Sequence, residues 1–192
     1  TPPMGWNSYD GYIAKITHEQ VLENLEAFDK YLKPFGYEYF VLDYGWFIGD
    51  DGVELDEFGR PQPSRVYYPD GLKPLIDRAH ELDIKFGLWY IRGVPRKAVK
   101  QGLRVKGTNY TVGEIVDKSS VCSWSEQNWG VNMNKPGGQK YYDSIIEQLN
   151  EWEIDFVKYD DIVPHPAEIN AVADAIAKHE RGIVLSLSPG NE

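Results

Sequence analysis

The sequence is poor in cysteine, in basic residues and in continuous apolar stretches. Cys122 is the sole cysteine among 192 residues, so no disulfide can form within the chain. No segment approaches the roughly 18 consecutive apolar residues that a membrane-spanning helix needs. The 20 lysines and arginines are outnumbered by 30 aspartates and glutamates, which gives a formal net charge of −10. This balance argues against nucleic acid and against an anionic membrane surface as partners.

Histidines and phosphate-binding glycine motifs are scarce as well. The four histidines have no metal-ligand spacing, and we therefore expect no zinc site. Gly137-Gly138 lacks the preceding strand and the suitably spaced lysine of a phosphate-binding loop, so an enzyme of phosphorylated metabolites is not favoured. The chain opens at Thr1-Pro2-Pro3 with neither a basic segment nor an apolar run, and we expect no signal peptide within it.

Aromatic side chains, in contrast, are abundant. They make up 14% of the residues, with 6 tryptophans and 13 tyrosines. Sugar-binding sites use such rings because one face of a pyranose packs well on a flat apolar surface. For any single ring, packing in the core is the commoner reason for its presence. The composition therefore permits a carbohydrate site without requiring one.

Five short apolar segments are predicted to be buried parallel strands. They cover residues 4–9, 39–44, 84–91, 154–160 and 183–188. Apolar residues at helical spacing predict helices at about 17–32, 72–82 and 138–152, and from 166 onward. A capping-box pattern of Thr17 and Gln20 predicts the start of the first helix. Residues 92–136 carry little periodicity, and a loop of that length is expected to be functional or to contain a small substructure.

Alternating strands and helices predict an α/β fold of parallel β-α units. Asp43, Asp160 and Ser188 each end a strand. Barrel enzymes place catalytic groups at such ends, which favours a (β/α)8 TIM-barrel type, although an open doubly wound sheet binds ligands at the same ends. A complete barrel needs about 250 residues. We therefore expect residues 1–192 to form one partial catalytic domain, an incomplete barrel of about five β-α units.

The segment Lys158-Tyr159-Asp160-Asp161 is the strongest local candidate for chemistry. Side chains alternate along a strand, so Lys158 and Asp160 are expected to point to the same side. The lysine charge would hold Asp160 ionised, as a carboxylate nucleophile requires. An ion pair that closes the end of the barrel, or two acids in a solvated turn, would explain the same residues without a catalytic role.

Asp43 and nearby aromatic residues suggest a sugar contact. Asp43 ends an apolar strand three residues before Trp46. A carboxylate can accept hydrogen bonds from sugar hydroxyls while a ring packs on the carbon face, but Asp43 could equally cap the following turn. Trp89 projects from the third strand, where core packing explains it equally well.

Four short motifs, each present once, together span almost the whole chain. They are Thr1-Pro2-Pro3-Met4-Gly5-Trp6-Asn7-Ser8, Tyr37-Glu38-Tyr39, Leu42-Asp43 followed by Trp46, and Lys158-Tyr159-Asp160. Together they resemble glycoside hydrolase family 27, the melibiases, which contain α-galactosidases and α-N-acetylgalactosaminidases. The resemblance implies the N-terminal part of a (β/α)8 barrel, with the remaining strands and a C-terminal β domain absent from this chain. It also implies a retaining hydrolase of terminal α-linked galactose-type sugars that needs no cofactor.

The resemblance assigns roles to individual residues. Asp160 matches the nucleophile, which forms a covalent glycosyl-aspartate intermediate, and Lys158 matches a lysine that binds the sugar. Asp43 matches the first of two acids that hold the axial hydroxyl side of galactose. Trp89 stands where the family usually has a tyrosine, and Tyr9 where it often has a tryptophan wall. The resemblance further suggests a secreted or periplasmic protein.

The chain departs from the family at positions that recognise the sugar. Tyr44 replaces the second acid, and the changed environment at C6 would suit an L-arabinopyranoside, which lacks the hydroxymethyl group. Ser188 replaces a glutamate of the α-galactosidases and resembles the α-N-acetylgalactosaminidases, in which a small residue leaves space for an acetamide. Ile162 replaces a disulfide cysteine, which leaves Cys122 unpaired. Galactose, N-acetylgalactosamine and L-arabinopyranose therefore stay open, with Tyr44, Ser188, Trp46 and Asp161 as further candidate substrate contacts.

A retaining glycosidase needs a second carboxyl group about 5 Å from the nucleophile. By the resemblance, this acid/base aspartate comes from the sixth strand region, and neither Asp161 nor Glu192 matches its motif. General acid–base catalysis contributes about 10²–10⁴-fold, so we expect this chain by itself to turn over ordinary glycosides poorly. The alternative from another class is a non-catalytic carbohydrate-binding fragment. The oligomeric state is not predicted.

Overall fold

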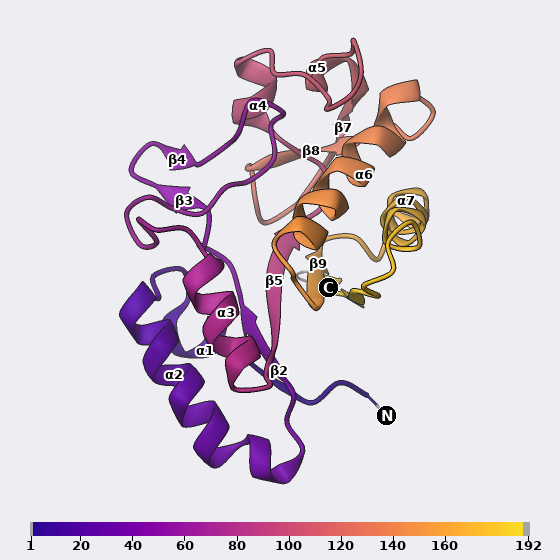
Figure 1. Ribbon diagram of the computed structural model, residues 1–192. Coiled ribbons are helices and arrows are strands. Elements are labelled where there is room, and N and C mark those ends of the chain that lie inside the picture. Colours follow the sequence, from indigo (N-terminus) through magenta and orange to yellow (C-terminus); the bar gives the residue numbers. More distant parts are fainter. Residues whose placement is uncertain (1, 190–192) are drawn as a thin grey trace.

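The computed structural model describes residues 2–189, and its centre is a parallel sheet of five strands (Figure 1). The strands are β1 (Gly5–Asn7), β2 (Tyr39–Leu42), β5 (Lys85–Ile91), β9 (Phe156–Asp160) and β10 (Val184–Leu187). Every pairing between neighbours in this sheet is parallel. Thr1 and the candidate carboxylate Glu192 lie outside the described residues.

The order of the strands decides between the two arrangements that the sequence left open. The five strands lie side by side in the order in which the chain forms them, β1-β2-β5-β9-β10. A doubly wound sheet reverses its strand order at a switch point, whereas a barrel places each strand beside the previous one. The fold is therefore of the (β/α)-barrel type, with the five parallel strands that the sequence predicted.

Within the described residues, four helices of more than two turns accompany these strands. They are α2 (His18–Tyr31), α3 (Lys73–Glu81), α6 (Pro136–Glu151) and α7 (Pro166–Ile176). The predicted capping box starts α2: Gln20 N donates to Thr17 Oγ1 over 3.3 Å, and Thr17 N donates to Gln20 Oε1 over 2.9 Å. A proline in the first turn of α3, α6 and α7 costs no hydrogen bond, since that N–H has no partner within a helix. Helix α2 packs on α3, and α6 packs on α7 (Figure 1).

Two insertions extend from the C-terminal ends of β2 and β5. The first contains the hairpin of β3 (Ile48–Gly49) and β4 (Gly52–Val53). The second contains α4 (Arg96–Lys100), α5 (Val112–Ile115) and an antiparallel sheet of β6 (Val94–Pro95), β8 (Asn128–Val131) and β7 (Val116–Val121). Both lie at the end of the molecule toward which β5 runs, the upper end in Figure 1. The stretch 92–136, expected to be irregular, thus contains a small substructure.

Short elements at the ends of the strands differ from the sequence prediction. Strand β1 ends at Asn7, because Asn7 Oδ1 accepts a hydrogen bond from Tyr9 N over 2.8 Å and the chain turns into α1 (Tyr9–Tyr12). Tyr9 therefore lies on a short helix and not on a strand. Strand β2 ends before Asp43, which lies with Tyr44 in the following loop. The remaining short helix, η1 (Lys33–Phe35), closes the connection from α2 to β2.

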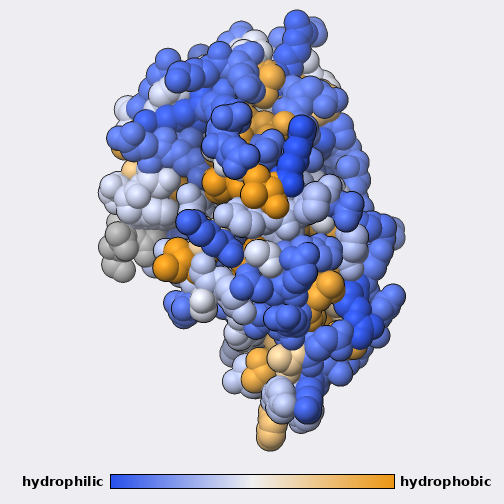
Figure 2. Space-filling model, turned by 90° about the vertical axis from the view of Figure 1, so that its left-hand side faces the viewer, coloured by the Kyte–Doolittle hydropathy of each residue, from blue (hydrophilic) through white to orange (hydrophobic). Residues whose placement is uncertain are grey.

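Aromatic rings form a large part of the hydrophobic core. The largest fully buried side chains include Trp46, Tyr68, Tyr141, Tyr142, Tyr159, Phe28, Phe40, Phe47 and Phe86. The face drawn in Figure 2 is largely hydrophilic, with hydrophobic residues in small separate groups. Among residues 2–189, no helix combines the length and the apolar character that crossing a membrane requires.

Gly45, in the loop after β2, adopts a φ of +103°, and a Cβ there would lie 2.3 Å from the Ala14 carbonyl oxygen. We predict that Gly45→Ala lowers the free energy of unfolding by more than about 2 kcal/mol, because backbone strain and a backbone clash add together. Gly52→Ala is the matched control: its φ is +85°, but nothing lies within 4 Å of the added Cβ. It should cost only the strain, about 1–2 kcal/mol. Urea unfolding measures both, and equal losses would contradict the prediction.

Candidate active site

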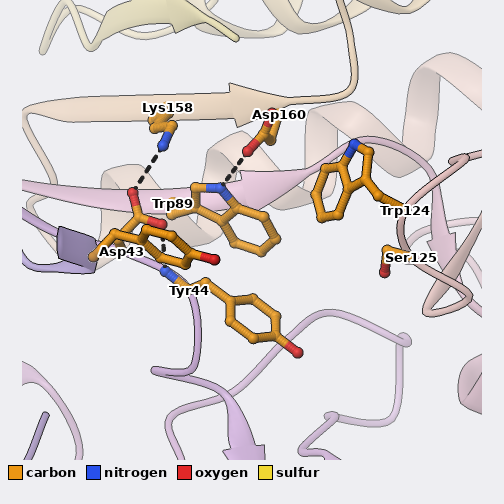
Figure 3. Close-up of a pocket in the computed structure, with 8 residues that line it drawn as sticks. Asp43, Tyr44, Trp89, Trp124, Ser125, Lys158 and Asp160 are labelled. Carbon is orange, nitrogen blue, oxygen red and sulfur yellow. Dashed lines mark hydrogen bonds and ion pairs between the residues drawn. The ribbon is translucent and has the colours of Figure 1, made fainter. Parts of the chain in front are cut away.

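A pocket of about 380 Å³ opens at the C-terminal ends of the parallel strands. It is lined by Tyr9, Asp43, Tyr44, Trp89, Trp124, Ser125, Lys158 and Asp160 (Figure 3). These residues come from α1, the loop after β2, β5, the loop between β7 and β8, and β9. The volume falls in the range of small-molecule sites, about 300–1,000 Å³. Apart from Trp124 and Ser125, every lining residue is a candidate that the sequence predicted.

The more deeply buried acid of the pocket is Asp43, which is 1% exposed against 9% for Asp160. Its Oδ2 accepts from Asn7 Nδ2 over 2.6 Å and from Lys158 Nζ over 3.0 Å, and its Oδ1 accepts from Tyr44 N over 2.7 Å. Its own N–H donates to Ser8 Oγ over 2.9 Å. These contacts offset the cost of burying the carboxylate. Lys158 has three donors and uses one on Asp43, which leaves donors for a ligand in the pocket.

Asp160 presents its carboxylate to the same pocket, held by two neutral donors. Trp89 Nε1 donates to Oδ2 and Asp161 N donates to Oδ1, both over 3.0 Å. Lys158 and Asp160 line one pocket, as strand alternation predicted, and Asp160 lies between Lys158 and Trp124 in the view of Figure 3. The ion pair of Lys158, however, is with Asp43 and not with Asp160. The immediate donors to Asp160 are therefore an indole and a backbone amide.

Aromatic side chains form the walls of the pocket. The rings of Tyr44 and Trp89 meet edge to face, with centroids 5.2 Å apart and an interplanar angle of 79°. Tyr9 is 45% exposed and Trp124 is 36% exposed. Burial raises the pKa of the Tyr44 phenol above its usual value. The hydroxyl of Tyr44 therefore stays protonated at neutral pH and can donate a hydrogen bond to a ligand.

Trp124 and Ser125 were missed from the sequence. They lie in the loop between β7 and β8, within the stretch 92–136 that showed little periodicity. The one signal that could have found them is a tryptophan flanked by Ser123 and Ser125 in a polar segment, since such a ring has little apolar surrounding to pack into. Their place in the pocket depends on how the second insertion folds.

Three predicted substrate contacts do not line the pocket. Trp46 is 1% exposed, and its Nε1 donates to the Trp89 carbonyl over 2.8 Å. Its ring therefore packs in the core, in contrast to the expected place beside a sugar. Asp161 is directed to Arg92, with Oδ2 3.0 Å from Nε. Ser188 follows β10 and donates its N–H to the Tyr159 carbonyl over 2.8 Å, at the sheet edge and not at the pocket wall.

The pocket also lacks the pattern of a metal centre. Within residues 2–189, no group of three or more histidine, cysteine, aspartate or glutamate side chains is placed to hold a metal ion. The chemistry available in the described part of the pocket is that of two carboxylates, an ammonium, two hydroxyl-bearing tyrosines and flat apolar rings. These groups suit a ligand with many hydroxyls and an apolar face.

The fold and the pocket define a class: a (β/α)-barrel protein with acids and aromatic rings in a pocket at the C-terminal ends of its strands. The family model for melibiases matches residues 6–182. The chain belongs to the melibiase family, as its motifs indicated.

Relatives of known structure and sequence agree with this assignment. A family 27 β-L-arabinopyranosidase from Geobacillus stearothermophilus is 43% identical, with a TM-score of 0.94 over 99% of this chain and 48% of that chain. A Bacillus halodurans C-125 protein, provisionally assigned as an α-N-acetylgalactosaminidase, is 40% identical, with a TM-score of 0.94 over 100% of this chain and 49% of that one. Alpha-galactosidase A of Cellvibrio japonicus is 26% identical over 97% of this chain and 38% of its own length. The chain thus spans half or less of these relatives.

The ion pair of Lys158 with Asp43 should contribute to stability, because Asp43 is buried. We predict that Lys158→Met lowers the free energy of unfolding by about 1.5–3 kcal/mol, the usual contribution of a hydrogen bond to a charged group. Lys85→Met is the matched control, since Lys85 forms an ion pair with Glu38 that is shorter, 2.7 Å against 3.0 Å, but joins exposed side chains. It should change stability by less than about 1 kcal/mol. Chemical denaturation of both variants tests this, and a larger loss for Lys85→Met would refute it.

Burial raises the pKa of the Cys122 thiol, whose residue is 8% exposed. A raised pKa means less thiolate at a given pH, so the alkylation rate of the native chain should reach its midpoint above the pH of about 8.5 typical of a free thiol. The measurement is the pH dependence of iodoacetamide labelling, with the urea-unfolded chain as control. The position of the midpoint separates the pKa from slow access, which lowers the rate at every pH. A native midpoint at or below the unfolded one would contradict the prediction.

Proposed function

We propose that this chain carries the nucleophile half of a retaining glycosidase, which removes terminal α-linked galactose-type sugars through a covalent glycosyl-Asp160 intermediate. The observation that carries the proposal is the carboxylate of Asp160: it faces the pocket at the end of β9 and accepts hydrogen bonds on both oxygens. Donors of this kind fix the direction of attack, which reduces the entropy cost of reaching the transition state.

Asp160 fits the nucleophile better than Asp43, the other acid that lines the pocket. Asp43 is bound by Asn7, Lys158 and a backbone amide. A nucleophile must release electron density to the anomeric carbon, and a carboxylate that is tied to an ammonium is a weaker candidate for this step. Asp43 and Lys158 together suit recognition, because they offer acceptors and donors to neighbouring sugar hydroxyls.

The pocket supports a galactose-type ring, and its Tyr44 wall favours one without a hydroxymethyl group. Tyr44 fills the position of the family's second acid, its ring packs on Trp89, and its hydroxyl stays protonated. A neutral ring offers less to a C6 hydroxyl than a carboxylate does. This supports β-L-arabinopyranoside hydrolysis as the second candidate, in line with the Geobacillus relative. Ser188, the clue to an acetamido sugar, does not line the pocket.

We propose that the acid/base carboxyl comes from outside the residues that line this pocket in the described part of the chain. Asp161 is next in sequence to Asp160, but its carboxylate lies beside Arg92 and away from the lining. The second carboxyl that a retaining mechanism needs must therefore be supplied elsewhere.

A covalent label tests the nucleophile. We predict that 2-deoxy-2-fluoro-galactosyl or 2-deoxy-2-fluoro-β-L-arabinopyranosyl donors, with leaving groups that depart without protonation, add one sugar to the chain. Such donors do not need the general acid, and the adduct should persist without the general base. Intact mass detects the adduct, and peptide mapping should place it on Asp160.

Two variants control this experiment. Asp160→Asn should take up no label, whereas Asp155→Asn, the same change just before β9 at its opposite end, should be labelled like the parent. The absence of an adduct on a chain that is folded by circular dichroism would reject the nucleophile and leave a carbohydrate-binding function. A faster reaction with the arabinopyranosyl donor would favour the second candidate, and Tyr44→Asp should then shift the preference toward the galactosyl donor.

A further inference from the structure

The carboxylate of Asp160 is oriented by a hydrogen bond from the backbone of the next residue. Asp161 N donates to Asp160 Oδ1 over 3.0 Å. Asp161 itself has a φ of +55°, the left-handed region, which is unfavourable for a residue other than glycine. Such a conformation persists only if its surroundings hold it. The turn from Asp160 to Asp161 therefore needs an outside constraint.

Arg92, the first residue after β5, supplies this constraint from the neighbouring strand. Its backbone N–H donates to the Asp160 carbonyl over 3.1 Å, and its Nε donates to the Asp161 carbonyl over 2.7 Å. The carboxylate oxygen Oδ2 of Asp161 lies 3.0 Å from the same Nε. Arg92 thus contacts both residues of the turn. It holds the carbonyls of Asp160 and Asp161, and this fixes the direction of the Asp161 N–H.

The far side of the guanidinium is anchored to two other elements. Arg92 Nη1 donates to Glu168 Oε1 on α7 over 3.1 Å and to Ser120 Oγ on β7 over 3.0 Å. Glu168 is held in turn, since its Oε2 accepts from the Tyr142 hydroxyl on α6 and from Val131 N on β8. Arg92, which holds the turn, is therefore connected through hydrogen bonds to α6, α7 and the antiparallel sheet of the second insertion.

Burial makes this arrangement costly if its only purpose is stability. The Arg92 side chain is 2% exposed and that of Glu168 is 5% exposed. Removing both charges from water is unfavourable, and buried ion pairs often stabilise less than apolar residues of the same size. The planar fork of arginine, in contrast, can bind a carbonyl on one edge and a carboxylate on the other, which suits it to fixing geometry.

We propose that Arg92 is a positioning residue for Asp160: it holds the Asp160–Asp161 turn so that the Asp161 amide keeps the carboxylate directed at the anomeric carbon. The inference rests on the proposed function, in which Asp160 is the nucleophile. Arg92 does not line the pocket. Its loss should therefore slow the formation of the glycosyl-Asp160 bond and leave binding of the sugar nearly unchanged.

The test is the rate of covalent labelling by the fluorosugar donor, resolved into its maximal rate and its half-saturating concentration. For Arg92→Met we expect the maximal rate to fall by about 10²-fold, the usual effect of a displacement of about 1 Å in a reacting group. The half-saturating concentration should stay within about twofold, because uniform binding is not affected. Arg92→Lys keeps the charge but loses the fork, and its rate should lie between the parent and Arg92→Met.

Arg60→Met is the matched control. Arg60 is also buried, at 8% exposed, with an ion pair to Asp56 at 2.7 Å and a hydrogen bond to the Ser144 carbonyl, but it does not touch the turn. It should lower stability without changing the labelling rate of the folded chain. If Arg92→Met fails to fold, Arg92→Lys and Glu168→Gln carry the test, because each retains a polar side chain of similar size.

The outcomes separate this inference from the proposed function. If the folded parent chain takes up no label, Asp160 is not the nucleophile and both proposals fall. If the parent is labelled and a folded Arg92 variant reacts at the parent rate, only the positioning role is overturned. A variant whose half-saturating concentration rises while its maximal rate is unchanged also overturns it, since Arg92 would then act on binding.

Discussion

The parallel pairing of β5 with β9 is the constraint on which the site depends. Its register places Trp89 opposite Lys158 and Ile91 opposite Asp160, and the pairing continues past β5 through the hydrogen bond from Arg92 N to the Asp160 carbonyl. Side chains alternate along a strand, so a slip of one residue would turn Lys158 and Asp160 away from the pocket. The apolar residues of both strands thereby fix where the polar ones point.

Oppositely charged side chains form two layers of ion pairs at this end of the sheet. Asp43 and Lys158 pair in the pocket, and behind the pocket Arg92 pairs with Glu168 and Asp161. A buried charge without a partner is costly, so Asp43, Arg92 and Glu168 each need an opposite charge beside them. In both layers the partners come from different elements of the fold. The same pairing that makes the charges tolerable also fixes the directions of their donors and acceptors.

Part of the pocket wall comes from a segment that a minimal barrel does not need. The strands β5 and β9 carry Trp89, Lys158 and Asp160, while the loop between β7 and β8 contributes Trp124 and Ser125. Loops at the C-terminal ends of strands vary without disturbing the sheet, which is why they commonly adapt one scaffold to different ligands. The second insertion joins both roles, because Ser120 on β7 also binds Arg92.

The sequence by itself determined the five strands, the start of α2 at its capping box and the shared side of Lys158 and Asp160, since periodicity and local hydrogen bonding decide these features. Its motifs also indicated the melibiase family, which the family match supports. Only the tertiary structure decided that Trp46 packs in the core, that Trp124 reaches the pocket and that Arg92 binds the turn after Asp160. Each of these depends on contacts between segments distant in the chain, and no local pattern encodes which distant partner a side chain will meet.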